Sequence, residues 1–452
     1  MTGAEYAART PVLNHAPIAL ASMSTASDPN GPLRIAYLTY RGKPHVGGQG
    51  VYTRHLTKAL ADLGHEIEVF GGQPYPILDS RVPLHKLPSL DIFNEQYPGR
   101  LPAYWEMKSK EDVLETLQYL TGTFSEPLAF SARAYKALKS RTRDFDLVHD
   151  NQCLGSSILK IEKIIPTIVT LHHPITKDRT LEMAHTPTWW KRRAIGRWYS
   201  FVWMQGRVAS KMPRVVVVSE NSINDIHTDM GVSKDRMRLV PVGVDPDLFK
   251  PIPSIQRKPA HLITTASADV ALKGLSFLLE ALAKLRTERE VHLTIIGKPR
   301  AGASADLIES LDLQDCISYV SGVSDEQIVE LYASCELAVV PSLYEGFSLP
   351  AIEAMSTGIC LVATTGGALP EVTGRDGETV LSCPPADADA LAAAIRRGLD
   401  DKNLREKIGL AGRQRVAERW SWRHCAQLTV DQYRQVLSMP HNIAKLAKRD
   451  GR

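Results

Sequence analysis

Residues 34–70 read RIAYLTYRGKPHVGGQGVYTRHLTKALADLGHEIEVF, and this stretch determines the fold that we expect. Its first seven residues are rich in β-branched and aromatic side chains, as a buried strand requires, and a loop with several glycines follows. Residues 51–63 carry apolar side chains at helical spacing, and residues 66–70 have the composition of another strand. The order strand, loop, helix, strand is a βαβ unit, which predicts a parallel sheet.

The alternation of strands and helices continues along the chain in two series. The first series predicts further strands at 146–149, 167–171, 214–218 and 238–240. After VPVGVDP at 240–246, where two prolines flank a glycine, the second series predicts strands at 261–266, 291–296, 317–320, 336–340 and 359–363. Helices are expected at 274–286, 324–334 and 350–357 and over most of 386–437. Two successive series predict an α/β protein with two doubly wound Rossmann-like domains facing a central cleft.

Length and composition exclude several classes of protein. The 452 residues are two to three times a typical domain of about 150 residues. A net charge of +4, from 54 basic and 50 acidic residues, is too balanced for a nucleic-acid-binding protein. No apolar run approaches the roughly 18 residues of a membrane span. Six scattered cysteines without metal-ligand spacing predict free thiols and a cytoplasmic location. Residues 1–32 lack periodicity and a signal-peptide core, so a disordered tail is expected.

A glycine-rich loop, GKPHVGGQG at 42–50, lies between the first predicted strand and helix. Glycines let a backbone approach a ligand closely, and a helix N-terminus offers unpaired N–H groups to a phosphate. The loop matches neither the dinucleotide-binding pattern nor the P-loop pattern. A tight strand-to-helix turn therefore remains the alternative interpretation.

A second segment, YEGFSLPAIEAM at 344–355, follows the strand predicted at 336–340. Pro350 suits the first turn of a helix, which leaves three N–H groups directed into the preceding loop. These N–H groups, which together suit a diphosphate, belong to Phe347, Ser348 and Leu349. Glu345 on the loop and Glu353 on the helix can contact different parts of one long ligand. A capped helix with two surface glutamates is the alternative.

The segment 344–355 resembles the EGFGLPxxEAM signature of retaining GT-B glycosyltransferases of family 4. Other stretches follow in the order of that family, so that the resemblance extends from about Leu33 to Gln435: VGGQGVYTRHL, the T-x-H of Thr170 to His172, VVVVSE, VPVGVDPDLF and ERWSW. The resemblance implies an acceptor-side domain over 33–244 and a nucleotide-sugar-binding domain over 245–420. It further implies, over 421–452, a helix that returns to the N-terminal domain and a basic tail.

The resemblance implies a role for each matching residue. Glu345 is similar to the carboxylate that holds the donor sugar, and Glu353 is similar to the residue that takes the ribose hydroxyls. Backbone N–H groups would hold the sugar and the distal phosphate, and two glycines would close over them from the other domain. These backbone positions are Phe347, Ser348, Leu349, Gly47 and Gly48.

Lys273 is similar to the lysine of the R-x4-K donor clamp in this family, whose charge stabilises the leaving diphosphate. The chain departs from the family at the arginine position, which is Ala268 here. Either Lys298 or Arg300 supplies the missing charge, or Lys273 acts mainly alone. Taken by itself, a lysine at a helix start is commonly a solvated side chain.

His172 follows the strand predicted at 167–171, and the resemblance implies that it positions the donor sugar. With Glu345 and Lys273 it completes the expected catalytic set. His173 is the alternative for that place, and a histidine at a strand end is otherwise often structural. Ser219, Glu220 and Asn221 are expected to cap the next helix rather than to take part in catalysis.

No metal ion and no organic cofactor is expected. Three Asp-x-Asp stretches lie before a strand, at the crossing between domains and at a helix start, where turn and capping roles explain them. They are residues 144–146, 245–247 and 387–389. The resemblance implies a fold whose transferases use helix ends and basic residues in place of Mg²⁺.

The segment 186–212 has no acidic residue, six basic residues and four of the seven tryptophans. Projected as one helix, it has an apolar face of Trp190, Ala194, Trp198, Phe201, Val202 and Val208. Arg193, Arg197, Arg207 and Lys211 cluster on a neighbouring face. A basic amphipathic helix with aromatic residues suits an anionic membrane surface, here the inner face of the membrane. A core-packed helix with solvated cations is the alternative.

The expected function is therefore a retaining, metal-independent transfer of a hexosyl group from a nucleotide sugar to a lipid-linked or small-metabolite acceptor. The VGGQGVY stretch is more similar to family members that use UDP-sugars, which favours UDP-glucose or UDP-N-acetylglucosamine over GDP-mannose. In the front-face mechanism that the resemblance implies, the departing phosphate helps to deprotonate the acceptor. The alternatives are a non-catalytic sugar-nucleotide-binding protein, suggested by Ala268, and a UDP-sugar epimerase of the same fold.

Overall fold

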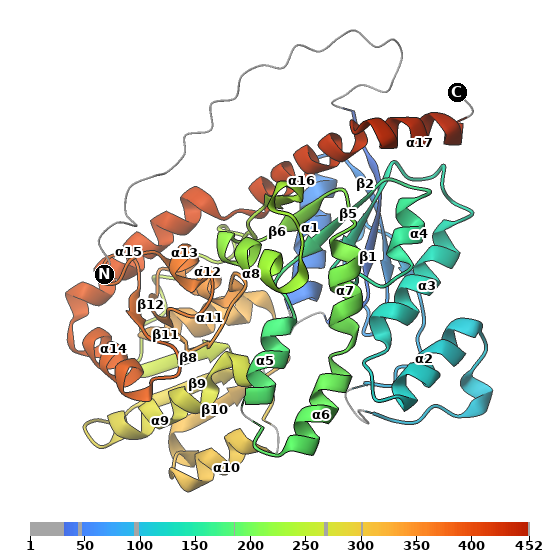
Figure 1. The fold of residues 1–452 in the computed structure, drawn as a ribbon. Helices are drawn as coiled ribbons and strands as arrows, with labels where there is room; N and C mark the ends of the chain where they lie inside the picture. Colours follow the sequence, from blue (N-terminus) through green and yellow to red (C-terminus); the bar gives the residue numbers. More distant parts are fainter. Residues whose placement is uncertain are drawn as a thin grey trace, which may run out of the picture. The chain divides into compact units, whose positions relative to one another are not determined.

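A computed structural model describes residues 31–43, 48–94, 99–184, 186–265, 270–299 and 302–450. Residues Leu33–Arg452 form one unit, to which all of the following refers. The expected disordered tail at 1–32 lies almost wholly outside the described residues. Two parallel sheets with helices packed against them make up the unit (Figure 1), which confirms the predicted α/β fold class.

The first sheet has the strand order β3-β2-β1-β4-β5-β6-β7, and every pair is parallel. Its strands are β1 Arg34–Thr39, β2 Glu66–Gly71, β3 Leu84–Lys86, β4 Leu147–Asn151, β5 Thr167–Leu171, β6 Val215–Val217 and β7 Met237–Leu239. The central strands β4 and β5 are buried at every position. Burial on both faces suits the largely apolar β5, whereas β4 also buries the polar side chains of His149, Asp150 and Asn151.

The helices that accompany the first sheet are α1 Gly48–Asp62, α2 Lys110–Leu120, α3 Glu126–Leu138, α4 Ile158–Glu162, α5 Thr176–Ala184, α6 Trp189–Trp198, α7 Phe201–Ala209 and α8 Glu220–Met230. Short 3₁₀ turns occur at η1 Tyr104–Glu106 and η2 Lys234–Arg236. The prediction of a single helix over 186–212 is wrong. The chain forms two helices there, α6 and α7, which are separated at Tyr199 and Ser200.

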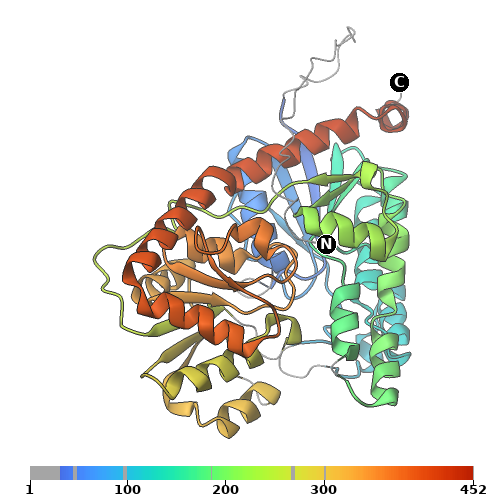
Figure 2. The ribbon, with the colours of Figure 1, turned by 60° about the vertical axis from the view of Figure 1, so that its left-hand side comes forward.

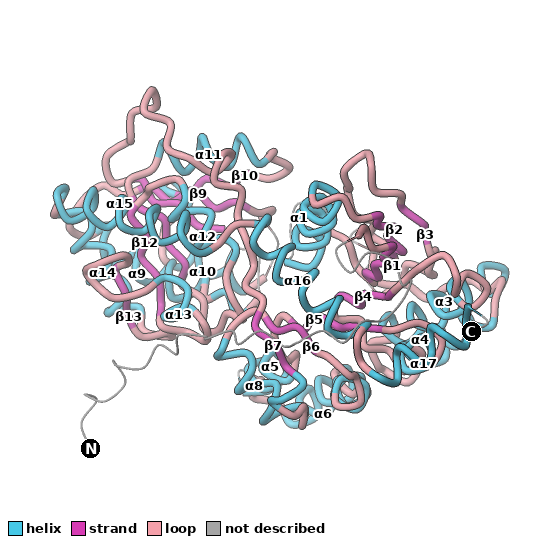
Figure 3. The backbone as a smooth tube through the Cα atoms, turned by 90° about the horizontal axis from the view of Figure 1, so that it is seen from above, coloured by secondary structure: helices cyan, strands magenta, loops and turns pink. Residues whose placement is uncertain are grey.

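The second sheet has the order β10-β9-β8-β11-β12-β13, again with every pair parallel. Its strands are β8 His261–Thr265, β9 His292–Ile296, β10 Ile317–Val320, β11 Leu337–Val340, β12 Cys360–Thr364 and β13 Leu381–Cys383. In both sheets the order reverses beside the first strand, as in dinucleotide-binding folds, and ligands bind at such a point. Figure 3 shows the two sheets as separate groups of strands.

The helices after residue 270 are α9 Leu275–Arg286, α10 Ala303–Ser310, α11 Asp325–Ser334, α12 Leu349–Ser356, α13 Leu369–Thr373, α14 Ala388–Asp400, α15 Lys402–Arg419, α16 Trp422–Leu437 and α17 Pro440–Asp450, with 3₁₀ turns η3 Ala271–Lys273 and η4 Gln314–Cys316. Helix α15 packs on the second sheet, whereas α16 packs on α1 and β5 of the first (Figure 2). Within the segment 421–452, where a helix and a basic tail are expected, α16 is followed by the helix α17.

Two contacts anchor α16 to the first sheet. The ring of Trp422 stacks on His55, with their centroids 5.1 Å apart. The hydroxyl of Tyr433 lies 2.6 Å from Nδ1 of His149 on β4. All six cysteines are buried and unpaired, which confirms the prediction of free thiols. Among the described helices, none combines the length and the apolar character that a bilayer crossing requires.

Candidate active site

Two loops leave the second sheet where its strand order reverses. Strands β8 and β11 are neighbours, and the chain continues from β8 to η3 and from β11 to the segment 341–348. The backbone N–H of Leu343 donates to the carbonyl of Leu272 over 2.7 Å, which joins the two loops. Gly274 must lack a side chain because a Cβ there would lie 2.0 Å from the carbonyl oxygen of Pro341. The tertiary fold thus brings Lys273 beside the loop that carries Glu345.

Lys273 and Glu345 form an ion pair. The Nζ of Lys273 lies 2.8 Å from Oε1 of Glu345, and the hydroxyl of Ser342 donates to the same oxygen over 2.7 Å. Glu345 is 9% exposed, whereas about a third of the Lys273 side chain faces solvent. A charge-assisted hydrogen bond orients both groups. The structure therefore brings together two residues of the expected catalytic set.

The N-terminus of α12 adjoins this pair. Its N-cap, Ser348, has φ +93° and ψ +87°, a conformation that favours glycine, and its buried hydroxyl has no hydrogen-bond partner among the described residues. Phe347 packs its ring against Trp420. Among the described turns and loops, no backbone hydrogen bond is donated by Phe347, Ser348 or Leu349. Three N–H donors and one hydroxyl are thus available to a ligand at this helix end.

Glu353 lies one helical turn further along α12. Burial and the nearby charge of Asp325 raise the pKa of its carboxyl to about 8. Within the described part of the chain, the carboxylate makes no hydrogen bond. A carboxyl group in this state suits a ligand that offers hydroxyl donors, because the new hydrogen bonds favour the ionised form.

His172 and His173 follow β5 and have different surroundings. Nε2 of His172 lies 2.7 Å from Oδ1 of Asn151, whose amide nitrogen donates to Thr53. Burial, with a contribution from the charge of His173, lowers the pKa of His172 to about 3, so this ring is neutral. Nε2 of His173 lies 2.9 Å from Oδ2 of Asp178.

The charges of Lys273 and Glu345 affect the pKa of His173. Burial opposes its protonation, but the hydrogen bond and charge of Asp178, together with the charge of Glu345, raise its pKa above the ordinary value. His173, the alternative to His172 in the sequence analysis, therefore interacts electrostatically with Lys273 and Glu345. His172 instead belongs to a hydrogen-bonded network of the first sheet. A role for either ring in the reaction stays a prediction.

The loop of Glu345 also meets the first sheet directly. A Cβ on Gly346 would lie 2.4 Å from the carbonyl oxygen of His172, so only glycine fits there. The hydroxyl of Ser219 donates to the carbonyl of Gly346 over 2.6 Å and accepts from the N–H of Ser222. The predicted capping role of Ser219 is thus confirmed. The same side chain holds the segment 341–348, which carries Glu345, close to the end of β5.

Several residues around the site could not be singled out from the sequence. Ser342 and Asp178 orient Glu345 and His173. Gln152 accepts from the N–H of His172 and donates to the carbonyl of His173, which holds the backbone before the first histidine and after the second. The hydroxyl of Tyr344 donates to Asp225 of α8 over 2.7 Å. Gln152 and Tyr344 act across long sequence separations, and Ser342 and Asp178 act through the conformation of a loop, so a motif provides no signal for any of them.

Some predicted site residues remain without a structural account. Gly47, Ala268 and Arg300 lie outside the described residues. Gly48 begins α1 and is exposed, with open space where a side chain would be. Lys298 lies in an exposed loop after β9. Their roles stay predictions.

Two of the three Asp-x-Asp stretches make local hydrogen bonds. Asp245 accepts from the N–H of Asp247, and Asp387 caps α14 by accepting from Ala390, which confirms the turn and capping interpretation there. Among the described residues, no three histidine, cysteine, aspartate or glutamate side chains gather as a metal site would require.

The tryptophan-rich segment departs from its predicted apolar face. Phe201, Val202 and Val208 are buried in the core, as that face required, but Trp190 and Ala194 are exposed. Trp190 and Ala194 are exposed because the helix breaks between α6 and α7, so that the first turns of α6 do not pack on the core. The exposed fractions of Trp189, Trp190 and Trp203 are 70%, 56% and 71%.

Sequence comparisons match both halves of the chain to known families. The family described as "Glycosyltransferase Family 4" matches residues 46–248, and "Glycosyl transferases group 1" matches residues 251–415. An "MMP alpha-(1->4)-mannosyltransferase" of Mycolicibacterium hassiacum is 48% identical over 409 residues, which cover 90% of this chain and 99% of that protein.

Solved structures share the fold. Sucrose-phosphate synthase from Thermosynechococcus elongatus has a TM-score of 0.69 at 24% identity, over 90% of this chain and 99% of that one. The Anabaena protein HepE, solved in complex with UDP-glucose, has a TM-score of 0.64 at 17% identity, over 88% of this chain and 99% of that one.

Proposed function

This chain belongs to the GT-B glycosyltransferases of group 1, and from that premise we propose that it transfers a mannosyl group from GDP-mannose to a sugar hydroxyl, forming an α-(1→4) linkage. The observation that carries the proposal is the 48% identity to an α-(1→4)-mannosyltransferase along almost the whole of that protein. The UDP-glucose or UDP-N-acetylglucosamine donor expected from the VGGQGVY stretch has no comparable support, and a mannosyl donor replaces it here.

The proposed reaction retains the anomeric configuration. Mannose is α-linked in GDP-mannose, and the product of the relative is named as an α-linkage. The bond between the anomeric carbon and the diphosphate oxygen breaks, and the acceptor oxygen bonds to the same face of that carbon. The proton of the acceptor hydroxyl passes to the departing phosphate. No protein nucleophile is required, so Glu345 is free to bind the donor.

Each site residue has a role in this proposal. Lys273 exchanges part of its interaction with Glu345 for the diphosphate, whose developing charge it stabilises. The N–H groups at the start of α12 and the hydroxyl of Ser348 bind the phosphate and the sugar. Glu353 accepts the ribose hydroxyls. His172 and His173, which adjoin Gly346 in the loop of Glu345, position the sugar.

We propose that the leaving group is stabilised without a metal ion, by Lys273 and the N-terminus of α12. Activity in EDTA at the level of untreated protein is the expected result, and restoration by Mg²⁺ after loss in EDTA would contradict it. Donor hydrolysis by purified protein distinguishes a transferase from a non-catalytic sugar-nucleotide-binding protein.

The exposed segment of α6 and α7 supports a further partner, an anionic membrane surface. Six cations and three exposed tryptophans are gathered there without an acidic residue. Each cation near such a surface contributes about 1 kcal/mol. Co-sedimentation should be stronger with anionic than with neutral vesicles and should weaken with salt.

A combined variant tests the membrane proposal. Changing Arg193, Arg197, Arg207 and Lys211 to glutamine should abolish the preference for anionic vesicles. As a matched control, four exposed cations elsewhere are changed to glutamine, which should preserve it: Lys250, Lys402, Lys407 and Arg423. Equal binding of wild-type protein to both kinds of vesicle would exclude this surface.

The experiment that tests the proposed function is a donor screen. GDP-mannose should stabilise the purified protein against thermal unfolding more than UDP-glucose or UDP-N-acetylglucosamine does at equal concentration, because a ligand that binds the folded state stabilises it more when its Kd is lower. A larger shift with either UDP-sugar would contradict the proposed donor.

A further inference from the structure

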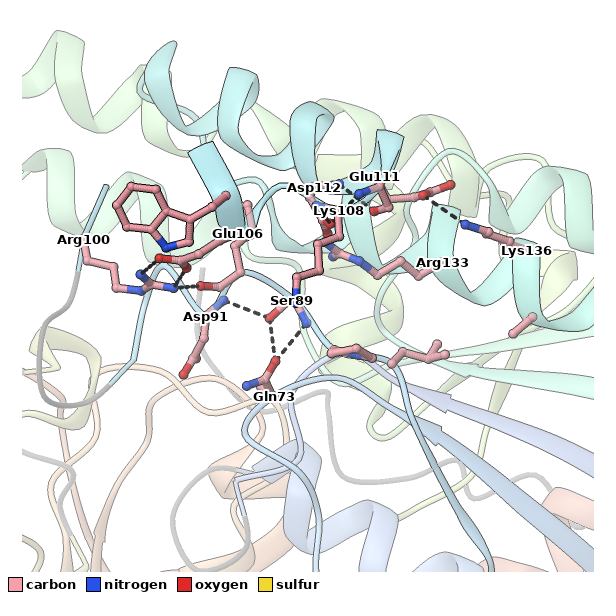
Figure 4. Close-up of a pocket in the computed structure, with 16 residues that line it drawn as sticks. Gln73, Ser89, Asp91, Arg100, Glu106, Lys108, Glu111, Asp112, Arg133 and Lys136 are labelled. Atoms are coloured by element: carbon pink, nitrogen blue, oxygen red, sulfur yellow. Dashed lines mark hydrogen bonds and ion pairs between the residues drawn. The ribbon is translucent and has the colours of Figure 1, made fainter. Parts of the chain in front are cut away.

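Two cavities beside the first sheet differ in how their charges are partnered. In the cavity between β3 and α3, about 730 Å³ in volume, three cations lie against carboxylates (Figure 4). The pairs are Arg100 with Glu106, Arg133 with Asp112 and Lys136 with Glu111. A second cavity, about 450 Å³ in volume, is lined by a buried arginine, Arg214, that has no such partner among the described residues.

The second cavity lies at the amino edge of the first sheet, where its strands begin. Arg214 directly precedes β6, and Arg236 directly precedes β7. His172 and His173 follow β5 at the opposite edge, which is the edge where doubly wound sheets bind their ligands. The second cavity is therefore separate from the site around Glu345, and none of the roles proposed above uses it.

Arg214 is a buried cation without a counter-ion. The residue is 7% exposed, and its Nη2 donates to Oε1 of Gln435 on α16 over 3.3 Å. Its Nε and Nη1 are buried and have no hydrogen-bond partner within the described part of the chain. Burial and the charge of Arg238 lower the pKa of the guanidinium, and the charge of Asp235 opposes this shift. A buried charge without compensation is strongly unfavourable, and an anion in the cavity would relieve it.

Further positive charge surrounds Arg214. Lys211 and Arg236 line the same cavity. Nη1 of Arg236 donates to two carbonyl oxygens of the chain that joins α7 to β6, over 2.9 and 3.4 Å, which holds its guanidinium in place. His441 also lines the cavity and lies in the first turn of α17, where the helix N-terminus adds a partial positive charge.

Cations outside the lining offset its two carboxylates. Oε1 of Glu162 lies 2.7 Å from Nζ of Lys445 on α17. The hydroxyl of Ser233 donates to Asp235 and lowers the pKa of its carboxyl, and the charges of two neighbouring arginines contribute to this shift. The cavity and its immediate surroundings therefore have an excess of positive charge, which favours an anionic ligand.

A phosphate group matches this lining. Guanidinium groups bind phosphate oxygens through paired N–H donors, and a lysine adds a point charge. The volume of about 450 Å³ falls within the range of roughly 300–1,000 Å³ that is usual for ligand sites. The cavity thus has room for a phosphate and for part of the molecule that carries it.

We propose that the cavity at the amino edge of the first sheet binds a phosphate monoester through Arg214, Lys211 and Arg236. The phosphate is the counter-ion that Arg214 lacks within the fold. A soluble ester and the headgroup of an anionic lipid offer the same group, with a charge of about −1.5 to −2 at pH 7. The proposal does not depend on which sugar the enzyme transfers.

Two probes with one headgroup test the site. Glycerol 3-phosphate, titrated calorimetrically into the full chain at constant ionic strength, represents the soluble ester. Vesicles that contain phosphatidic acid, used in co-sedimentation, represent the lipid. The wild type should bind at least one of them, and Arg214→Gln should weaken that binding about tenfold or more.

Lys211→Gln changes an exposed position, where folding is not at risk, and should weaken the same binding about threefold. If Arg214→Gln does not fold, this variant and Arg236→Gln decide. Lys402→Gln removes an exposed cation elsewhere and should leave the binding unchanged. Lys273→Ala, which removes the cation beside Glu345, should leave it unchanged as well.

Loss of glycerol 3-phosphate binding in the Arg214 and Lys211 variants would uphold the proposal with a soluble ester as the ligand. Vesicle binding alone, with the same losses, would uphold it with a lipid headgroup. Binding of neither probe by the wild type would overturn it. So would binding that survives these variants or that Lys273→Ala abolishes, because the phosphate would then bind elsewhere.

Discussion

Ser348 lowers the stability of the ligand-free protein in two ways that single substitutions can separate. Its φ of +93° places a side chain where glycine is preferred, and its buried hydroxyl has no hydrogen-bond partner in the part of the chain that the structure describes. The family signature has glycine at this position. A residue held in such a conformation stores about 1–3 kcal/mol of strain, and a buried hydroxyl without a partner costs about 1–3 kcal/mol.

Ser348→Ala removes the hydroxyl and keeps the strain, so it should stabilise the protein without ligand by about 1 kcal/mol or more. Ser348→Gly removes both and adds about 0.5–1 kcal/mol of conformational entropy to the unfolded chain. The glycine variant should therefore be the most stable of the three proteins, by about 1 kcal/mol over the alanine variant. Thermal and urea unfolding of the purified proteins measure these differences.

The same two variants should bind the donor more weakly. A hydrogen bond from the hydroxyl to a charged phosphate contributes about 1.5–3 kcal/mol, so the KM for the donor should rise about tenfold or more in both variants. Stability and affinity would then change in opposite directions. A glycine variant less stable than wild type would refute the argument from strain, and an unchanged KM in both variants would refute the role of the hydroxyl.

Three further substitutions test the site. Glu345→Gln should lower turnover at least about a hundredfold with the circular dichroism spectrum unchanged, and near-normal turnover would remove Glu345 from the site. Lys273→Ala should reduce both donor affinity and turnover, with partial recovery in Lys273→Arg; an unaffected enzyme would mean that another cation stabilises the diphosphate. Because burial raises the pKa of Glu353 to about 8, nucleotide affinity should increase from pH 6 to pH 9 as the carboxyl ionises, and Glu353→Gln should abolish that increase. The same raised pKa means that the wild type loses stability relative to Glu353→Gln over this pH range, which unfolding at several pH values measures.

Most of the fold could be predicted because parallel strands covered on both faces are short apolar runs. The strand predicted at 317–320 has the bounds of β10, and the helix predicted at 324–334 differs from α11 by one residue. Helix starts were predictable where a capping residue marks them, as Ser219 does for α8. The α/β class and the two-sheet organisation followed from these local signals.

The remaining features depend on tertiary contacts. The break between α6 and α7 was missed because a helical projection assumes an unbroken helix. In the structure Phe201 is buried in the core, whereas Trp190 is exposed to solvent. The motif identified Glu345, but its contacts with Lys273 and Ser342 join residues far apart in the chain or in a loop. The link of His173 to Asp178 depends on how the chain turns after β5.

The most direct test of the central claim is the structure of the product formed from GDP-mannose and α-(1→4)-linked mannobiose. We predict a trisaccharide with a new mannosyl unit on the terminal 4-hydroxyl, whose one-bond carbon–proton coupling in NMR identifies an α-linkage, and almost none of it with Glu345→Gln. A β-linkage, transfer only from a UDP-sugar, or equal product from the Glu345→Gln variant would contradict the account.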